Sequence, residues 1–178
     1  RTDQHFPYTT LFRSVLEYDL NLIKEGNSLE IIGLEKKIED IKFYLNEEKT
    51  DFVTFYGFID RVDLLNGNLR IIDYKTAKAK DLRISVKDDK KENLFFNDKY
   101  KQALQLCIYQ YCVENMQEFK NFDIETGIWS FAEVKNGVQN VEIKDGNLED
   151  ALQSIRNLIL EILNPEIPFT EKIHEKWS

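Results

Sequence analysis

Hydrophobic residues recur along the first half of the chain with two different spacings, which predict one helix followed by strands. Apolar positions in residues 15–24 follow the period of a helix. The stretch 29–45 has a mixed pattern that we interpret as a strand, and 52–65 and 69–74 are rich in the β-branched and aromatic residues typical of strands. Asn66-Gly67, between the last two, predicts a tight hairpin turn.

The second half alternates helical and strand patterns after a polar segment. Residues 76–97 are polar and charged and predict a long loop. The apolar run 98–116 predicts a buried helix, and 148–163 has the periodicity of an amphipathic helix. Between them, 127–134 and 138–143 have the composition of strands. The order of helix, three strands, helix, two strands and helix predicts an α/β fold.

A two-residue turn fixes the register of the central hairpin. If Asn66-Gly67 are the central residues of a type I′ turn, Asp63 lies opposite Arg70, an opposite-charge pair that stabilises a sheet. In the same register Asp60 lies opposite Asp73. Two like charges at that spacing destabilise a sheet, so this pair needs compensation.

Lys75 lies on the same face as Asp73 and offsets part of the charge of the two carboxylates. A divalent cation offsets it better, because Mg²⁺ is typically held by one or two carboxylates together with water and phosphate oxygens. Two structural alternatives stay open. The pair lies exposed at the end of the sheet, or the turn has another length and the two carboxylates never meet.

Two segments match a known family. Residues 57–60 read Gly-Phe-Ile-Asp, and 71–76 read Ile-Ile-Asp-Tyr-Lys-Thr. Together they resemble the core motifs of the PD-(D/E)XK nuclease superfamily, in particular its RecB-like and AddB-like branch. The resemblance implies a restriction-endonuclease-like core, αβββαβ, with a mixed central sheet flanked by helices, over residues 15–170. It also implies that Asp60, Asp73 and the backbone carbonyl of Tyr74 bind the metal, and that Lys75 is the catalytic lysine.

Further site residues follow from the resemblance and from helical geometry. Gln105 and Tyr109 share one stripe of the predicted helix and resemble a Q-h-x-x-Y signature that helps to place the active site and contacts the nucleic-acid strand. The alternative is that Tyr109 lies in the core and Gln105 bonds to backbone. Relatives carry an additional acidic or histidine ligand on the first helix, and Glu17 and Glu35 are the candidates for it here, each also readable as a solvated carboxylate.

The net charge of the chain and the local charge after the hairpin have opposite signs. The chain has a formal net charge of −8, which argues against a stand-alone nucleic-acid binder. Basic residues nevertheless outnumber acidic ones between 75 and 91, and we expect Lys78 and Lys80 to guide the strand, the alternative being a solvated loop.

The two ends of the chain indicate which residues are native, and the cysteines indicate the cellular compartment. Residues 6–14 resemble the translation of a sequencing-adaptor oligonucleotide, so we treat 1–14 as a non-native segment. The alternative is an ordinary polar N-terminus that leads into a helix. Residues 171–178 are expected to be a truncated tail. Cys107 and Cys112 lie in one helix, which favours core positions in a reducing, cytoplasmic compartment and no iron–sulfur cluster. No apolar run is long enough to predict a membrane span.

The resemblance therefore predicts a Mg²⁺-dependent deoxyribonuclease, with Mn²⁺ as a possible substitute and exonuclease action expected. Its partners would be DNA and a helicase domain or subunit, in a RecB/AddB-type system for DNA repair and recombination. The alternative function is a non-catalytic module of the same fold that binds DNA or a partner in such an assembly.

Overall fold

The computed structural model describes residues 7–85 and 99–168. The predicted tail at 171–178, residues 1–6 and the second part of the predicted loop lie outside the described residues. The helices are α1 (Pro7–Lys24), α3 (Lys101–Glu114) and α4 (Leu148–Leu163), with 3₁₀ turns η2 (Gln117–Phe119) and η3 (Phe131–Asn136). The strands are β1 (Leu29–Tyr44), β2 (Phe52–Leu65), β3 (Asn68–Lys75), β4 (Arg83–Ser85), β5 (Ile124–Ser130), β6 (Val138–Asn140) and β7 (Glu142–Lys144).

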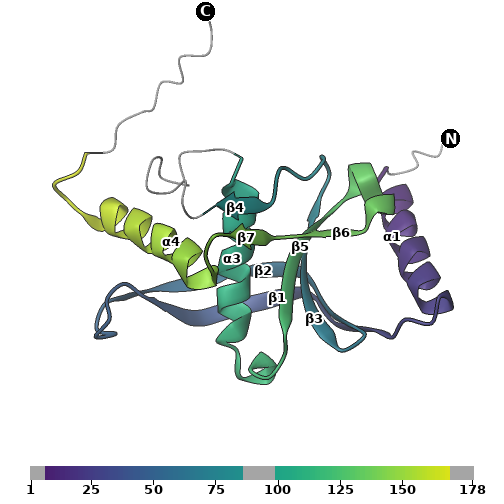
Figure 1. Ribbon diagram of the computed structural model, residues 1–178, viewed down its shortest axis with the longest axis horizontal. Helices are drawn as coiled ribbons and strands as arrows, with labels where there is room; N and C mark the ends of the chain where they lie inside the picture. The colour runs from purple at the N-terminus through teal and green to yellow at the C-terminus, as the bar shows by residue number, and fades with distance from the viewer. Residues whose placement is uncertain (1–6, 86–98, 169–178) are drawn as a thin grey trace, which may run out of the picture.

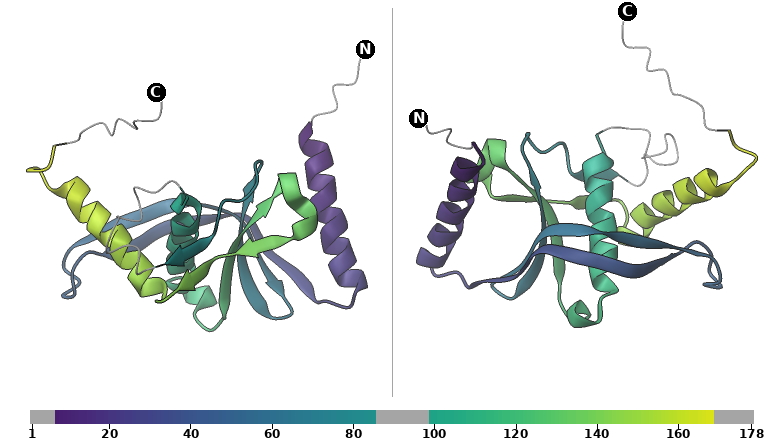
Figure 2. Two further views of the ribbon diagram at one scale, coloured as in Figure 1. Left: turned by 45° about the horizontal axis from the view of Figure 1, so that its top comes forward. Right: turned by 180° about the vertical axis from the view of Figure 1, so that it is seen from behind.

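Five strands form the central sheet, in the order β1-β2-β3-β5-β6. β3 and β5 run parallel, whereas the other neighbours in this sheet are antiparallel. α3 crosses one face of the sheet, and α1 and α4 lie at opposite ends of the molecule (Figure 1 and Figure 2). The predicted α/β fold, with a mixed sheet flanked by helices as in a restriction-endonuclease-like core, is confirmed.

The β2–β3 hairpin has the predicted register. Leu65 pairs with Asn68, and Asp63 pairs with Arg70. Asn66 and Gly67 have φ angles of 53° and 88°, the positive values that a type I′ turn requires at both central positions. This two-residue turn thus determines which residues pair across the hairpin, from Leu65 and Asn68 to Arg61 and Ile72.

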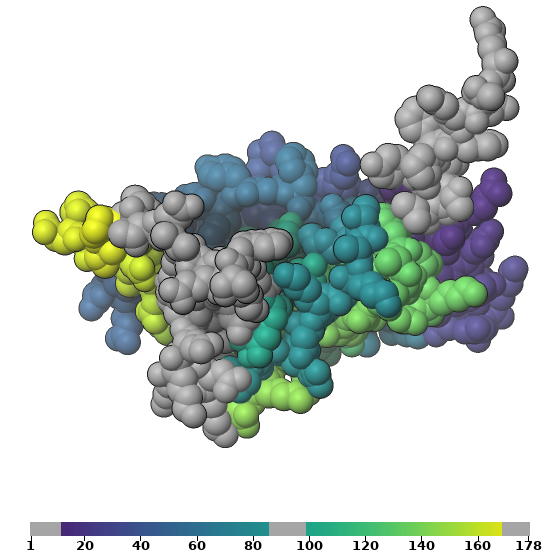
Figure 3. All heavy atoms as spheres, turned by 90° about the horizontal axis from the view of Figure 1, so that it is seen from above, coloured from purple at the N-terminus to yellow at the C-terminus, as the bar shows by residue number. Residues whose placement is uncertain are grey.

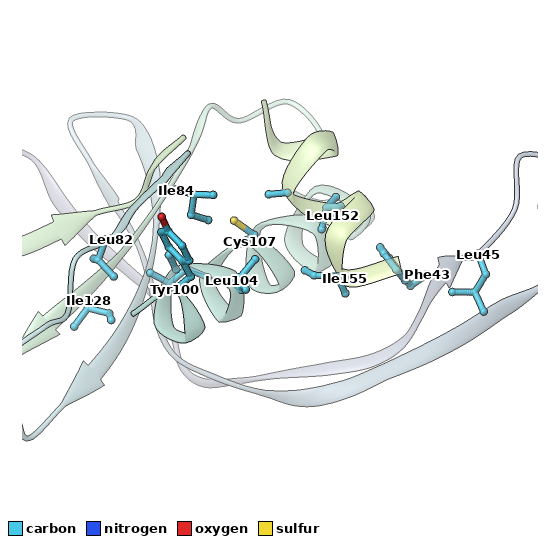
Figure 4. Close-up of a cluster of buried hydrophobic side chains, with 13 residues drawn as sticks. Phe43, Leu45, Leu82, Ile84, Tyr100, Leu104, Cys107, Ile128, Leu152 and Ile155 are labelled. Atoms are coloured by element: carbon cyan, nitrogen blue, oxygen red, sulfur yellow. The ribbon is translucent and has the colours of Figure 1, made fainter. Parts of the chain in front are cut away.

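Two helices cover the sheet on the α3 side. The cluster in Figure 4 joins Leu104 and Cys107 of α3 to Leu152 and Ile155 of α4 and to Phe43 of β1. Both cysteines are fully buried and not disulfide-bonded, as predicted for core residues. α4 begins with a capping box between Asn147 and Asp150, which satisfies backbone N–H groups of its first turn.

Several predicted boundaries differ from the structure. The first helix begins at Pro7 and not at 15; its residues 7–14 lie in the adaptor-like segment, whose origin stays a prediction. α3 is shorter than 98–116. The strand predicted over 127–134 ends at Ser130, where the chain turns into η3, closed by a hydrogen bond from Trp129 Nε1 to the Val134 carbonyl at 3.2 Å.

The predicted loop contains a strand. β4 pairs in parallel with β7 as a separate two-stranded sheet, so the segment predicted as one strand over 138–143 is divided between two sheets. Val141 N–H still bonds to Thr126 of the main sheet, whereas Glu142 N–H bonds to Leu82. Only Ile84 of β4 is fully buried, and three residues are too few to display a strand pattern.

Among the described residues, no helix is long and apolar enough to cross a membrane.

Candidate active site

The two opposed carboxylates lie where β2 and β3 separate. The paired residues end at Arg61 and Ile72, so Asp60 and Asp73 are the next position of the hairpin register. Asp60 Oδ2 accepts the backbone N–H of Tyr74 at 2.7 Å. The side chain of Asp60 thus takes the place of the backbone acceptor that continued pairing would provide.

Asp73 is buried next to a lysine. Lys75 Nζ lies 2.6 Å from Asp73 Oδ2 and forms an ion pair with it. Burial raises the pKa of Asp73 above its ordinary value, and the charge of Asp60 adds to this, while Lys75 opposes it. One ammonium therefore only partly compensates the two interacting carboxylates.

Gln105 connects this pair to α3. Its Nε2 lies 3.4 Å from Asp73 Oδ1 and donates to Tyr109 Oη at 2.9 Å, and its Oε1 lies 3.4 Å from Lys75 Nζ. Burial raises the pKa of Tyr109, which keeps its hydroxyl protonated and able to donate a hydrogen bond. The structure thus brings the predicted helix pair Gln105 and Tyr109 into contact with the predicted catalytic residues.

The carbonyl of Tyr74 points toward the same side as Asp60. In an extended strand the N–H and C=O of one residue point in the same direction, and the N–H of Tyr74 points to β2. The Tyr74 ring lies on the other face of the sheet, stacked on Phe131 with centroids 5.3 Å apart. The backbone of Tyr74, and not its side chain, is the part that faces the site.

The remaining predicted residues lie further out. Glu35 has a φ of 50° and falls opposite Asp60 in β1, since its neighbours pair with Ile59 and Arg61, but its side chain is exposed. Glu17 is exposed on α1. In residues 7–85 and 99–168, no group of three His, Cys, Asp or Glu side chains could hold a metal ion.

Lys78 and Lys80 lie exposed on the segment that leaves the site. Lys78 pairs with Glu133 at 3.0 Å, and the backbone N–H of Lys80 donates to Gln102 Oε1 of α3 at 2.8 Å. Seen from above, the segment after β3 (teal) lies between strands β1 and β2 (blue) and η3 (green) (Figure 3).

The sequence predicts the pair of Asp63 and Arg70, but not the buried group of four charges behind the site to which it belongs. Asp19 of α1 pairs with Arg61, and Asp63 pairs with both Arg61 and Arg70. Burial alone would lower the pKa of Arg61, but the hydrogen bond to Asp19 and the charge of Asp63 raise it above its ordinary value. A signal for this cluster exists, because Asp19 stands one helical turn after the buried Val15.

The donor set fits a divalent cation of the hard, oxygen-binding kind. Asp60 and Asp73 supply two carboxylates, and the Tyr74 carbonyl points to the same side. Within the described part of the chain, Asp73 Oδ2 is a buried oxygen whose one charged partner is Lys75, at 2.6 Å. A divalent cation would compensate the charge of the two carboxylates more fully than this one ammonium does.

Comparison with known proteins agrees with this geometry. The model of the PD-(D/E)XK nuclease superfamily matches residues 9–174. No curated protein matches the sequence.

Proposed function

The chain belongs to the PD-(D/E)XK nuclease superfamily, and on that basis we propose that it is a Mg²⁺-dependent nuclease that hydrolyses phosphodiester bonds in DNA. The observation that carries the proposal is the pair Asp60 and Asp73 at the end of a register-defined hairpin, with Lys75 beside it. A purely structural sheet gains nothing from two interacting carboxylates, one of them buried.

Asp60, Asp73 and the Tyr74 carbonyl are the groups that would hold the cation. When bound, Mg²⁺ polarises a phosphate oxygen and lowers the pKa of water in its coordination sphere. Tyr74 N–H orients Asp60 by binding its Oδ2, which leaves Oδ1 as the ligand atom. The same two carboxylates also accept Mn²⁺, which prefers oxygen ligands as well.

Lys75 is the proposed catalytic lysine. Its ammonium lies between Asp73 Oδ2 and Gln105 Oε1, so two acceptors restrict its position. From there it orients the attacking water and stabilises negative charge on the reacting phosphate. Gln105 and Tyr109 support this geometry from α3 and contact the nucleic-acid strand.

The substrate strand is proposed to pass the segment that carries Lys78 and Lys80, both exposed near the site. Because the whole chain has a net charge of −8, its own affinity for DNA is weak and a larger assembly delivers the strand. We propose a RecB/AddB-type exonuclease domain in the cytoplasm, working with a helicase in DNA repair and recombination.

Incubation with labelled single- and double-stranded DNA and Mg²⁺ tests the proposal. Cleavage that stops with EDTA supports it. Mg²⁺ binding measured by calorimetry separates the alternative, a non-catalytic module that binds DNA or a partner. If the chain binds no Mg²⁺ and cleaves neither DNA, the alternative replaces the nuclease.

A further inference from the structure

A buried network of four charges lies on the face of the sheet opposite to the candidate active site. It consists of Asp19 of α1, Arg61 and Asp63 of β2, and Arg70 of β3, all buried. Arg70 and Asp73 are three residues apart in β3, so their side chains point to opposite faces. The network therefore touches no atom of the reacting groups proposed above.

The contacts of the network restrict each member to one orientation. Arg61 donates from Nη1 and Nη2 to the two oxygens of Asp19, at 2.7 and 3.2 Å, and from Nε to Asp63 at 2.5 Å. Arg70 donates to the two oxygens of Asp63 at 2.7 and 2.9 Å. Two positive and two negative groups balance, and removal of one leaves a buried charge unpaired.

Arg61 connects this network to the site through two routes. It directly follows Asp60 in the chain and is the last residue of β2 that pairs with β3. Its Nη1 also lies 3.5 Å from Tyr74 Oη. Since the N–H of Tyr74 binds Asp60, both partners of that hydrogen bond are linked to Arg61, Asp60 through the peptide bond and Tyr74 through its hydroxyl.

Asp19 connects the network to α1. Its two oxygens fix the rotation of the guanidinium, which the single bond to Asp63 does not. We infer that Asp19 is a positioning residue, which acts through Arg61 to hold Asp60 and the Tyr74 backbone in the arrangement that binds the cation. The inference rests on the proposed function.

Outer contacts of this kind typically change metal affinity or activity about 10- to 100-fold. Asp19→Asn keeps the size of the side chain and removes its charge. We expect it to weaken Mg²⁺ binding by about 10-fold or more in calorimetry. In the metal-free chain we expect faster hydrogen exchange at the Tyr74 amide, measured by NMR. Glu25→Gln, an exposed change directly after the same helix, is the matched control and changes neither quantity.

Thermal unfolding separates positioning from simple stability. Both measurements are made at least ten degrees below the unfolding midpoint of each variant. Asp19→Glu, which restores the carboxylate, recovers part of the affinity. If Asp19→Asn lowers only the unfolding midpoint, and leaves both Mg²⁺ affinity and Tyr74 exchange as in the wild type, the inference is wrong.

Two further outcomes have defined meanings. If Asp19→Asn does not fold, Tyr74→Phe is tested in its place, because it removes one contact of Arg61 and leaves the backbone N–H of residue 74 intact. We again expect weaker Mg²⁺ binding and faster exchange of that amide. Unchanged values of both quantities would contradict the inference. If the wild type itself binds no Mg²⁺, the proposed function fails and the inference with it. Equal Mg²⁺ binding and equal Tyr74 exchange in the wild type and Asp19→Asn reject the inference and leave the proposed function standing.

Discussion

The backbone N–H of Tyr74 binds Asp60 Oδ2 at 2.7 Å, at the position where the hairpin register would continue to Ile59. A side-chain oxygen thus replaces a strand carbonyl at the point where the two strands separate. The replacement satisfies the Tyr74 donor and fixes the orientation of the carboxylate at once.

Asp73→Asn is expected to abolish DNA cleavage while the fold is retained. Asp73 would be a direct metal ligand, so the loss exceeds the roughly 100-fold effect of an outer contact. Because burial raises the pKa of Asp73, the folded state favours the neutral form more than the unfolded chain does. The metal-free variant should therefore unfold at an equal or higher temperature. Near-wild-type cleavage of single- and double-stranded DNA would reject the assignment.

Lys75→Ala is expected to lower kcat by about 100-fold or more, because it removes the only positive side chain that contacts Asp73 among the described residues. KM should change much less, since the lysine acts on the reacting phosphate. Lys24→Ala, at the exposed end of α1, serves as the control for charge. Equal losses in both variants would show that net charge, and not this position, matters.

Replacing Lys78 and Lys80 by alanine should weaken DNA binding without stopping chemistry, because both are exposed beside the site. Each lysine that contacts a phosphate contributes about 1 to the slope of log affinity against log salt. Anisotropy of a labelled single strand, titrated in EDTA at several salt concentrations, measures that slope. Lys144→Ala, a change at another exposed lysine, is the control. If the double variant and this control have the same slope of log affinity against log salt, Lys78 and Lys80 do not guide the strand.

Asp63→Ala is expected to destabilise the fold by about 3–5 kcal/mol, because it leaves the buried Arg61 and Arg70 without their shared partner. Urea unfolding followed by circular dichroism gives the free energy. Glu30→Ala, at an exposed position of β1, should change stability by less than about 0.5 kcal/mol. A loss for Asp63→Ala as small as that would mean that water replaces the ion pairs.

Neither cysteine should react in the folded protein. Burial raises the pKa of Cys107 and of Cys112 to about 12, so at pH 8 roughly one thiol in ten thousand is the reactive thiolate. Mass spectrometry after iodoacetamide treatment should show no adduct on the native chain and two adducts in urea. Rapid labelling of the native chain would contradict the burial of these side chains.

The hairpin and the helix pair could be predicted because their geometry is local. A two-residue turn sets the register from Asn66-Gly67 to Arg61, and helical spacing places Gln105 and Tyr109 on one face. Beyond Arg61 the strands separate, and the turn no longer determines which residues pair. The hydrogen bond from Tyr74 N–H to Asp60 depends on tertiary structure.

The ion network and the β4–β7 pair could not be read from the sequence for the same reason. The predicted pair of Asp63 and Arg70 exists, but its burial follows from α1, which lies over it and contributes Asp19. β4 forms through pairing with residues much later in the chain. Local spacing places Asp19 on the buried face of the first helix, but it identifies neither the partner of Asp19 nor that of β4.

The connectivity of the sheet also sets an order of assembly. The β2–β3 hairpin closes through a two-residue turn, a local event that takes microseconds, and it carries Asp60 and Asp73. The parallel pairs β3–β5 and β4–β7 join segments far apart in sequence and close only after long loops have formed. During synthesis the two carboxylates can therefore meet before α3 and Gln105 leave the ribosome, so an incomplete chain carries both carboxylates without the helix that contacts Asp73.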